Sequence, residues 1–558
     1  MFSNETLSIV LSGAAGQGIQ TVEKLLTKIA KESGYYVFAT KEYMSRVRGG
    51  NNSTEILISS KPVMAFRNKI DILVTLNNNS IDRLRNRISN KTFILGEEAY
   101  VKNEINKLPV PILQLAKDVG NPIYANSVSS GILSGIIDAD LEIVKKCVSD
   151  CFSTKNPEIV KKNITATVKG YNFGKSLNLR VNIKKNPKIK NHYLINGSQA
   201  VSKGAIAGGC NFISSYPMSP ATAVFTELAK ASKEYNIIVD QAEDEIAAAN
   251  MVIGAWYAGA RGLVSTSGGG FALMTEAISL SGMIETPIVV HLAQRPGPAT
   301  GLPTRTEQGD LNLALYAGHG SFPRIIFAPS GLDEAYYLTA QAFNYADEFQ
   351  VPVFVLTDQY LLDSIYNVEK FPNVELTRHI VKTDENYKRY EITEDGISPR
   401  GIPGFGTGVV RVDSDEHDEY GHITESSEVR TKMVNKRMKK LDKIIEKSIE
   451  PVLYGHKDYD YLFVSWGSTS LILKEALENL ENNRVALLHF PQVYPLPKSS
   501  KKYFKKAKKL IFVEQNITGQ FADLVKQTYG INTSKRILKY DGFPFSVEEL
   551  TDKIKGEL

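Results

Sequence analysis

Short apolar segments, each followed by a polar or glycine-rich loop, constrain the fold of this chain more than any other feature. The clearest are at residues 210–214, 262–266, 288–292, 324–328 and 353–356. Apolar runs of this length are typical of buried strands, and the sequence between them is long enough for crossover helices. We therefore predict an α/β protein with several open parallel-sheet domains, in which ligands bind at the carboxyl ends of strands.

Changes in composition divide the chain into a modular series. The predicted pieces are an α/β domain at 1–178, a basic, proline-broken linker at 179–195, a second α/β domain at 196–366, a charged, loop-rich segment at 367–450 and a last α/β domain at 451–558.

The charged segment ends in a predicted basic helix at 431–448. An apolar stripe of Met433, Val434, Met438, Leu441 and Ile445 follows helical spacing along it.

Composition excludes several classes of protein. No window reaches about 18 uninterrupted apolar residues and the first residues lack a signal-peptide pattern, so we expect a cytoplasmic protein without a membrane span. A net charge of +5 with short, scattered basic runs does not indicate nucleic-acid binding. The three cysteines, Cys147, Cys151 and Cys210, cannot build a four-cysteine cluster. We predict no metal site on this chain, and any redox metal must lie on another one.

An acidic triplet, Glu243-Asp244-Glu245, runs directly into an alanine-rich helix. Unpaired carboxylates beside a packed helix cost several kcal/mol unless something binds them. The triplet therefore predicts contact with a cofactor.

Two glycine-rich turns follow predicted strands. Gly13, Gly16 and Gly18 precede a helix at 19–32, where backbone N–H groups suit an anionic ligand, although a tight turn without a ligand fits equally well. Ser267 and Gly268 belong to the turn 265–270, whose small residues leave space for a ligand or a partner backbone.

The loop that follows the strand at 288–292 is rich in arginine, threonine and proline. Arg295, Thr304 and Arg305 are its main polar candidates. Arginine offers paired donors to carboxylates, and proline reduces the entropy of the loop. The loop is therefore predicted to bind a carboxylate or a carbonyl group.

Together these segments resemble the 2-oxoacid:ferredoxin oxidoreductases. The resemblance to the α subunit lies in residues 211–220, with their Tyr-Pro-Met-Ser-Pro core, and in 243–246, 265–271, 294–310, 398–404, 415–422, 513–516 and 539–545. Residues 13–19 and the Arg-Gly-Gly segment at 48–50 are similar to the family's γ unit, here fused ahead of α.

The resemblance implies an enzyme that cleaves a 2-oxoacid, transfers the acyl group to coenzyme A and passes electrons to ferredoxin. It implies a thiamine diphosphate pyrimidine-binding domain at 196–366 and a transketolase C-terminal-like domain at 451–558. Glu245 would contact the aminopyrimidine of thiamine diphosphate, with Glu243 as the alternative.

The substrate residues implied by the resemblance surround the same loops. Ser219 stands where family members commonly carry threonine, and it keeps the hydroxyl. Arg295 would hold the 2-oxoacid, and four further residues, Tyr216, Pro217, Thr304 and Arg305, would line its pocket. The resemblance leaves the preferred 2-oxoacid and the ligand of the N-terminal glycine turn open.

The Gly-Asp-Gly motif that holds magnesium and diphosphate in thiamine enzymes is missing, and Gly309-Asp310-Leu311 is the nearest approach. A β subunit is therefore expected to supply Mg²⁺, the diphosphate contacts and a [4Fe–4S] cluster. His417 and His422 lie in an acidic string that we interpret as a solvated or intersubunit loop.

Two other functions remain open from the sequence. One is a non-redox thiamine enzyme of the transketolase type, which would need the missing motif. The other is a noncatalytic regulatory protein that binds a nucleotide or coenzyme A through its N-terminal glycine turn.

Overall fold

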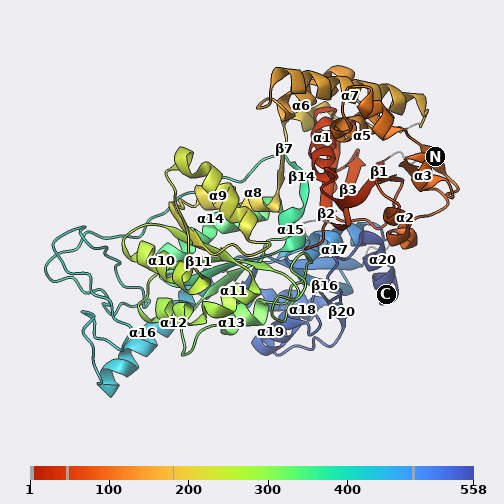
Figure 1. Cartoon of the computed structure of the whole chain (residues 1–558). Helices are drawn as coiled ribbons and strands as arrows, with labels where there is room; N and C mark the ends of the chain where they lie inside the picture. The colour runs from red at the N-terminus through yellow and green to blue at the C-terminus, as the bar shows by residue number, and fades with distance from the viewer. Residues whose placement is uncertain (1–4, 46–48, 180, 481–483) are drawn as a thin grey trace. The chain divides into compact units, whose positions relative to one another are not determined.

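A computed structural model of the chain describes residues 5–45, 49–179, 181–480 and 484–558. They form two compact α/β units (Figure 1). The first unit contains Met1–Asn196, Asp363–Lys370 and Ser546–Glu548, and the second contains Gly197–Leu362, Phe371–Phe545 and Glu549–Leu558. The chain therefore passes from one unit to the other several times.

The first unit is built on an eight-stranded sheet. In spatial order its strands are β6 (Lys107–Pro109), β5 (Phe93–Gly96), β4 (Ile72–Thr75), β1 (Thr6–Ala15), β3 (Gly49–Ser59), β2 (Tyr36–Glu42), β14 (Ile365–Val368) and β7 (Tyr193–Asn196). The half from β6 to β1 is parallel, and the half from β3 to β7 is antiparallel. The predicted parallel sheet is thus only partly correct here, because the short connection between β2 and β3 cannot make a parallel crossover.

The helices of this unit are α1 (Ile19–Glu32), α2 (Asn79–Arg83), α3 (Glu98–Val101), α4 (Ile112–Lys117), α5 (Ala125–Ile136), α6 (Leu141–Cys151) and α7 (Pro157–Ser176), with 3₁₀ turns at Arg85–Arg87, Pro122–Tyr124 and Pro187–Asn191. Helices α1, α5, α6 and α7 gather on one face of the sheet (Figure 1). Val22, Leu25, Leu26 and Ile29 recur at helical spacing on α1 and are fully buried in the core.

Two boundaries predicted from composition differ from the structure. The predicted linker at 179–195 runs into β7, and the second domain was predicted to continue to residue 366, within β14. These two strands pair with each other, with Asn196 opposite Ile365. An ion pair of 3.0 Å between Lys41 Nζ, on β2, and Asp363 Oδ1 also holds the residues just before β14 against this sheet. Short edge strands depend on distant pairing partners, which composition does not reveal.

The second unit contains two sheets. The larger has the order β18 (Gln492–Tyr494), β12 (Ile325–Phe327), β13 (Pro352–Asp358), β11 (Ile288–Gln294), β10 (Gly262–Thr266), β8 (Phe212–Ser215) and β9 (Ile238–Gln241). The smaller has the order β15 (Val452–Gly455), β17 (Val485–Phe490), β16 (Tyr461–Trp466), β19 (Lys509–Glu514) and β20 (Arg536–Leu538). All pairs are parallel except β12–β18 and β15–β17. The strands predicted between residues 210 and 356 are confirmed.

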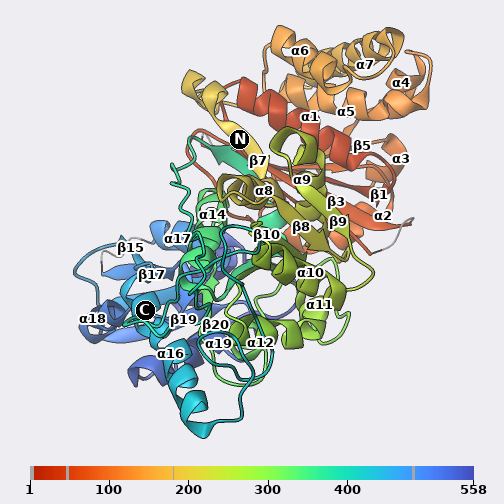
Figure 2. The same ribbon diagram turned by 90° about the vertical axis from the view of Figure 1, so that its left-hand side faces the viewer.

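Helices cover the larger sheet, with α8, α9 and α14 on one side and α11 and α12 on the other (Figures 1 and 2). The helices of this unit are α8 (Gly197–Ala207), α9 (Thr222–Tyr235), α10 (Glu245–Tyr257), α11 (Gly268–Leu273), α12 (Thr275–Met283), α13 (Leu311–Tyr316), α14 (Leu332–Phe349), α16 (Ser427–Glu446), α17 (Thr469–Glu478), α18 (Lys501–Lys506) and α19 (Gln520–Tyr529), with a 3₁₀ turn at Lys498–Ser500. Helices α15 (Gln359–Asp363) and α20 (Val547–Lys555) contain residues of both units. Among the described residues, no helix has the length and apolar character needed to span a membrane.

Most of the predicted last domain, 451–558, belongs to the same compact unit as the larger sheet, and its standing as a separate domain stays a prediction. Its strand β18 completes the larger sheet by pairing with β12, where Phe327 lies opposite Gln492. Loops of both sheets also meet around the buried Asp358 carboxylate, which accepts hydrogen bonds from Ser468 Oγ at 2.5 Å and Thr306 Oγ1 at 3.2 Å. These contacts hold the loops above the larger sheet in place.

Helix α16 buries charged residues instead of the predicted apolar stripe. Of that stripe only Met433 is buried, whereas Lys436 and Lys440 are almost inaccessible to solvent. Lys436 Nζ lies 2.8 Å from Glu285 Oε1, and Lys440 Nζ lies 2.5 Å from Glu285 Oε2. Burial lowers the pKa of Lys440 to about 8, although Glu285 favours its charged form. The basic face of the helix can be buried because the Glu285 carboxylate supplies its counter-charge.

We predict that Glu285→Gln destabilises the protein strongly, because it leaves two buried ammonium groups without a counter-charge. Chemical denaturation should show a loss of about 3–5 kcal/mol in the free energy of unfolding. The control is Glu428→Gln, which breaks an exposed pair with Lys432 on the same helix and should leave the unfolding midpoint unchanged. Equal effects of the two substitutions would contradict this interpretation.

Candidate functional site

Four neighbouring parallel strands of the larger sheet bring the predicted site residues to one edge. In the order β11, β10, β8 and β9, their carboxyl ends lead into the loops at 295–310, 267–270, 216–220 and 242–245. Because parallel strands end at the same edge, loops far apart in the sequence lie next to one another.

Glu245 is the first residue of α10 and is 4% exposed. Asp244 caps the helix, since its Oδ1 accepts a hydrogen bond of 2.8 Å from the Ala247 N–H. Glu245 Oε1 is buried and has no hydrogen-bond partner within the described part of the chain. Glu243, in contrast, is exposed. A buried carboxylate oxygen without a donor is costly, which indicates a ligand that provides one.

The turn 267–270 packs closely against Glu245. A β-carbon placed on Gly270 would lie 2.5 Å from Glu245 Oε1, so only glycine fits there. Ser267 is fully buried, and its Oγ also lacks a hydrogen-bond partner among the described residues. The turn therefore combines a backbone without side chains with a hydroxyl that has no described partner, and ligand binding by Ser267 and Gly268 stays a prediction.

At the other end of the turn, Gly268 lies close to a second carboxylate, that of Asp310. A β-carbon on Gly268 would lie 2.5 Å from Asp310 Oδ1 and 2.6 Å from Asp310 Oδ2. Burial and the nearby Glu307 raise the pKa of Asp310 to about 7, against an opposing effect of Arg295. The sequence interpretation assigned Asp310 no role. Its position directly before an apolar helix, at the end of an arginine-rich loop, is the signal that marks it.

Arg295 and Ser219 are brought together by the fold. Arg295 Nη1 donates a hydrogen bond of 2.7 Å to the carbonyl oxygen of Ser219. Ser219 and Tyr216 are exposed, and Pro217 is half-buried between them. Burial lowers the pKa of Arg295, although Asp310 favours its charged form. The loop after β8 and the loop after β11 thus form one polar surface around the Arg295 guanidinium.

Arg305 faces the last part of the chain. Its guanidinium stacks 4.9 Å from the ring centroid of Phe543, and its Nη1 donates to the carbonyl oxygen of Thr304 at 3.3 Å. The neighbouring Thr306 N–H donates to the carbonyl oxygen of Gly542 at 3.1 Å. Thr304 and Arg305 therefore lie where the 295–310 loop is anchored.

Gln308 fixes the far end of this loop. Its Nε2 donates to the Trp466 carbonyl oxygen at 2.9 Å, and its Oε1 accepts hydrogen bonds from Thr469 Oγ1 at 2.8 Å and the Gln515 N–H at 3.1 Å. This fully buried residue was not identified from the sequence. Buried polar networks of this kind hold a loop in one conformation.

A buried histidine supports the strands beneath the site. His291 Nδ1 lies 2.8 Å from Ser265 Oγ, and His291 Nε2 lies 2.8 Å from Thr357 Oγ1. Burial lowers the pKa of His291 to about 3, so the ring is neutral. The three side chains link β10, β11 and β13 by hydrogen bonds.

The N-terminal glycine turn is packed against its own unit. Gly18 adopts a positive φ of 75°, and a β-carbon there would overlap the side chain of Asn126. Gln17 closes the turn, because its Oε1 accepts a hydrogen bond of 2.6 Å from the Ala14 N–H. A β-carbon on Gly13 would overlap the Gln17 side chain. Gly16 adopts a positive φ of 90°, which favours glycine. These contacts explain the glycines locally, and their role in ligand binding stays a prediction.

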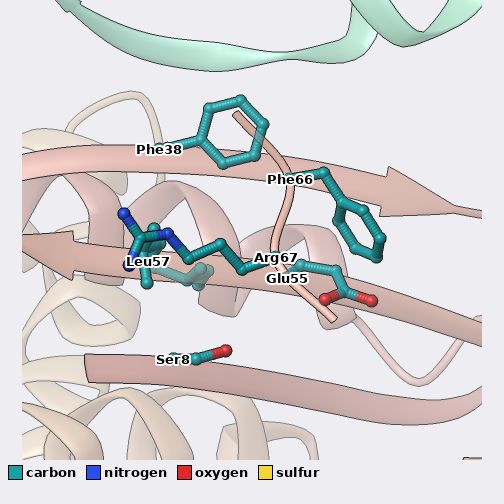
Figure 3. A pocket seen from close by; sticks show the side chains of 7 residues that line it. Ser8, Phe38, Glu55, Leu57, Phe66 and Arg67 are labelled. Atoms are coloured by element: carbon teal, nitrogen blue, oxygen red, sulfur yellow. The ribbon is translucent and has the colours of Figure 1, made fainter. Parts of the chain in front are cut away.

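The first unit also contains a small cavity of about 10 Å³ (Figure 3). It is lined by Ser8, Phe38, Glu55, Ile56, Leu57, Phe66 and Arg67. A cavity of this size has room for about one water molecule, which excludes a cofactor. Arg48 of the Arg-Gly-Gly segment at 48–50 lies outside the described residues.

The two histidines of the acidic string have different surroundings. His422 is exposed and lies 3.3 Å from Asp418 Oδ2, as expected for a solvated loop. His417 is fully buried with its ring 3.9 Å from that of Tyr390, so it is not solvated, and the alternative of an intersubunit loop stays a prediction. The described residues contain no group of three or more His, Cys, Asp or Glu side chains arranged to hold a metal ion.

Two family models match the chain. Residues 203–436 match the thiamine diphosphate-binding model of pyruvate flavodoxin/ferredoxin oxidoreductase, and residues 8–173 match the model of pyruvate ferredoxin/flavodoxin oxidoreductase. The first match covers all four loops of the candidate site.

Similar proteins carry names that are consistent with these two family models. A 2-oxoglutarate synthase subunit KorA from Methanocaldococcus jannaschii is 35% identical over 65% of this chain and 95% of its own length. The solved 2-oxoglutarate:ferredoxin oxidoreductase from Magnetococcus marinus, described with 2-oxoglutarate, coenzyme A and succinyl-CoA bound, is 29% identical, covers both chains completely and superposes with a TM-score of 0.93.

The 2-oxoacid:ferredoxin oxidoreductase subunit alpha from Sulfolobus sp. is 33% identical over 98% of this chain and 96% of its own length. A match at this level over nearly both complete chains includes the N-terminal unit as well as the candidate site. The chain therefore belongs to the family of 2-oxoacid:ferredoxin oxidoreductase α subunits.

Proposed function

We propose that this chain is the fused γ–α subunit of an enzyme that oxidatively decarboxylates a 2-oxoacid, forms an acyl-coenzyme A and passes electrons to ferredoxin. The observation that carries the proposal is the buried carboxylate of Glu245, which lacks a donor among the described residues and faces a glycine turn. A ligand there must donate a hydrogen bond to the carboxylate. The aminopyrimidine of thiamine diphosphate has this property.

The residues around Glu245 fit this cofactor. Glu245 would accept a hydrogen bond from the aminopyrimidine ring, while Ser267 and the backbone at Gly268 would contact the cofactor from the turn. When bound, thiamine diphosphate supplies the nucleophile and the electron sink that removal of CO₂ from a 2-oxoacid requires. Burial of Glu245 keeps water away from the hydrogen bond and strengthens it.

The 2-oxoacid would bind beside Arg295. A guanidinium binds a carboxylate or a carbonyl oxygen through paired donors, and the hydrogen bond to the Ser219 carbonyl oxygen holds it in place. The remaining proposed lining residues are Tyr216, Pro217, Thr304 and Arg305. The names of the M. jannaschii and M. marinus relatives support 2-oxoglutarate as one candidate substrate, with pyruvate and 2-oxobutyrate as others. Coenzyme A is the acyl acceptor in this proposal.

A β subunit completes the proposed enzyme. Three cysteines cannot provide the four thiolates of a [4Fe–4S] cluster, and the sequence lacks the Gly-Asp-Gly motif for magnesium and diphosphate. The proposal therefore places the cluster, Mg²⁺ and the diphosphate contacts on β, and ferredoxin would receive its electrons from there.

The function is tested by producing this chain with a β subunit and measuring the reduction of an electron acceptor with pyruvate, 2-oxobutyrate, 2-oxoglutarate and branched-chain 2-oxoacids. We expect turnover that depends on a 2-oxoacid, coenzyme A and thiamine diphosphate, and none from this chain alone. Activity of the isolated chain, or a complex inactive with every acid, would refute the proposal.

Glu245→Gln in the assembled complex should lower kcat by about 10²–10⁴-fold, because an amide cannot replace the carboxylate as a proton-linked acceptor. Glu243→Gln is the matched control, and its exposed side chain should be dispensable. Gel filtration of both variants would show whether assembly is intact. Retained turnover in the first variant with loss in the second would transfer the role to Glu243.

Gly270→Ala should weaken cofactor binding, because the added methyl group would overlap Thr266 Oγ1, lie 2.5 Å from Glu245 Oε1 and displace these side chains. We expect the thiamine diphosphate concentration for half-maximal activity to rise at least about tenfold, in line with a cost of 1–3 kcal/mol for an overpacked site. Gly269→Ala is the control, since its methyl group meets only the Ala299 carbonyl oxygen at 3.7 Å. A similar increase in both variants would argue against the assigned contact.

A further inference from the structure

Asp310 immediately precedes α13 but does not cap it. An aspartate in this position usually accepts a hydrogen bond from a backbone N–H of the first turn, which contributes about 1 kcal/mol. Here the side chain makes no such bond, and its buried Oδ2 has no partner among the described residues. The protein thus leaves one carboxyl oxygen buried and without a partner where a capping position is available, which marks the side chain for another purpose.

The carboxyl group is directed at the glycine turn of the candidate site. Both of its oxygens come within 2.6 Å of the point where a Gly268 side chain would begin. Two residues further along the turn, a β-carbon on Gly270 would likewise lie 2.5 Å from Glu245 Oε1. Asp310 therefore lies at the turn that carries the proposed cofactor contacts, and its charge interacts with that of Arg295.

The backbone around Asp310 is fixed on both sides. Its N–H donates to Gln294 Oε1 at 3.0 Å, and the preceding Gly309 carbonyl oxygen accepts a hydrogen bond from Gln520 Nε2 at 2.8 Å. The Asn312 N–H donates to Gln520 Oε1 at 2.9 Å. These bonds come from side chains of β11 and α19, and they fix the backbone from which the carboxyl group extends.

Two charged residues influence Asp310. Glu307, in the same loop, disfavours its ionised form, and Arg295, at the end of β11, favours it. Gln520 on α19 is uncharged, and the residues of α11 that form the turn carry no titratable group. Burial is the largest effect and raises the pKa of Asp310 to about 7. At pH 7 about half of the Asp310 side chains are therefore neutral carboxylic acids, which can donate a hydrogen bond, and Arg295 is near enough for its charge to act on them.

We propose that Asp310 is a substrate-binding residue that donates a hydrogen bond from its neutral carboxyl group to an oxygen of the 2-oxoacid held by Arg295. This inference rests on the proposed function, because it requires a 2-oxoacid at Arg295. The Arg295 guanidinium and the Asp310 carboxylic acid would together donate hydrogen bonds to the 2-oxoacid from two sides. Loss of the proton would remove one donor and place a second negative charge beside the anionic substrate, which repels it.

The test is the pH dependence of kcat/KM for the 2-oxoacid in the assembled complex. In the wild-type enzyme, kcat/KM should fall about tenfold per pH unit above the pKa of Asp310 in the free enzyme. Asp310→Asn replaces the acid by an amide that donates at every pH. Its kcat/KM should stay within about tenfold of the wild-type value at pH 6, and the ratio of variant to wild type should rise steadily above pH 7.

A second variant checks that Asp310 is the titrating group. Glu307→Gln removes the charge that disfavours the ionised form of Asp310, so the fall in kcat/KM should begin at lower pH. In the double variant with Asp310→Asn this shift should vanish. Thermal unfolding and gel filtration would show that both variants fold and assemble.

Parallel pH profiles of the wild type and Asp310→Asn would overturn this inference alone. A wild-type kcat/KM that rises with pH, together with loss of activity in Asp310→Asn at every pH, would also overturn it, because the ionised form would then be the active one. A wild-type complex that turns over no 2-oxoacid would overturn the proposed function and this inference with it.

Discussion

The candidate site depends on the close approach of two carboxylates to one glycine turn. Glu245 meets the turn at Gly270 and Asp310 meets it at Gly268, so both positions exclude a side chain. The turn can have this shape only if β10 stands between β8 and β11 with their carboxyl ends level. Three buried oxygens there, on Glu245, Ser267 and Asp310, lack partners among the described residues. Together they form a polar surface that a bound molecule would complete.

Buried charge also organises the rest of the second unit. Asp347 lies between Arg261, at 2.7 Å, and Arg400, and all three side chains are almost fully buried. Arg400 additionally stacks over Trp256. These contacts, with those of Glu285, fix a long segment that has little regular secondary structure between β14 and α16. Buried ion pairs stabilise this segment, whereas apolar packing stabilises the sheets. Removing one partner of such a pair leaves the other charge buried and unpaired.

The sequence predicted the parts of this structure that local patterns control. The strands of the larger sheet, the helix after Gly18 and the burial of Glu245 follow from apolar runs, glycines and the cost of an unpaired acid. Pairing of β7 with β14 and of β18 with β12 was missed, because three or four residues carry too little pattern to show a distant partner. The charged buried face of α16 and the role inferred for Asp310 depend on partners far away in sequence. Family membership decided among the three functional hypotheses in favour of the oxidoreductase.

The pairing of β7 with β14 has a topological consequence. Asn196 ends one strand, Ile365 begins the other, and the two residues face each other in the sheet. The whole segment from Gly197 to Leu362 is therefore inserted between two paired strands, in place of a hairpin turn. The Cα atoms of the paired residues that flank it, Asn196 and Ile365, are about 5 Å apart, the usual spacing across an antiparallel pair. Any rearrangement within this segment must leave its two ends together, because both ends continue into paired strands of one sheet.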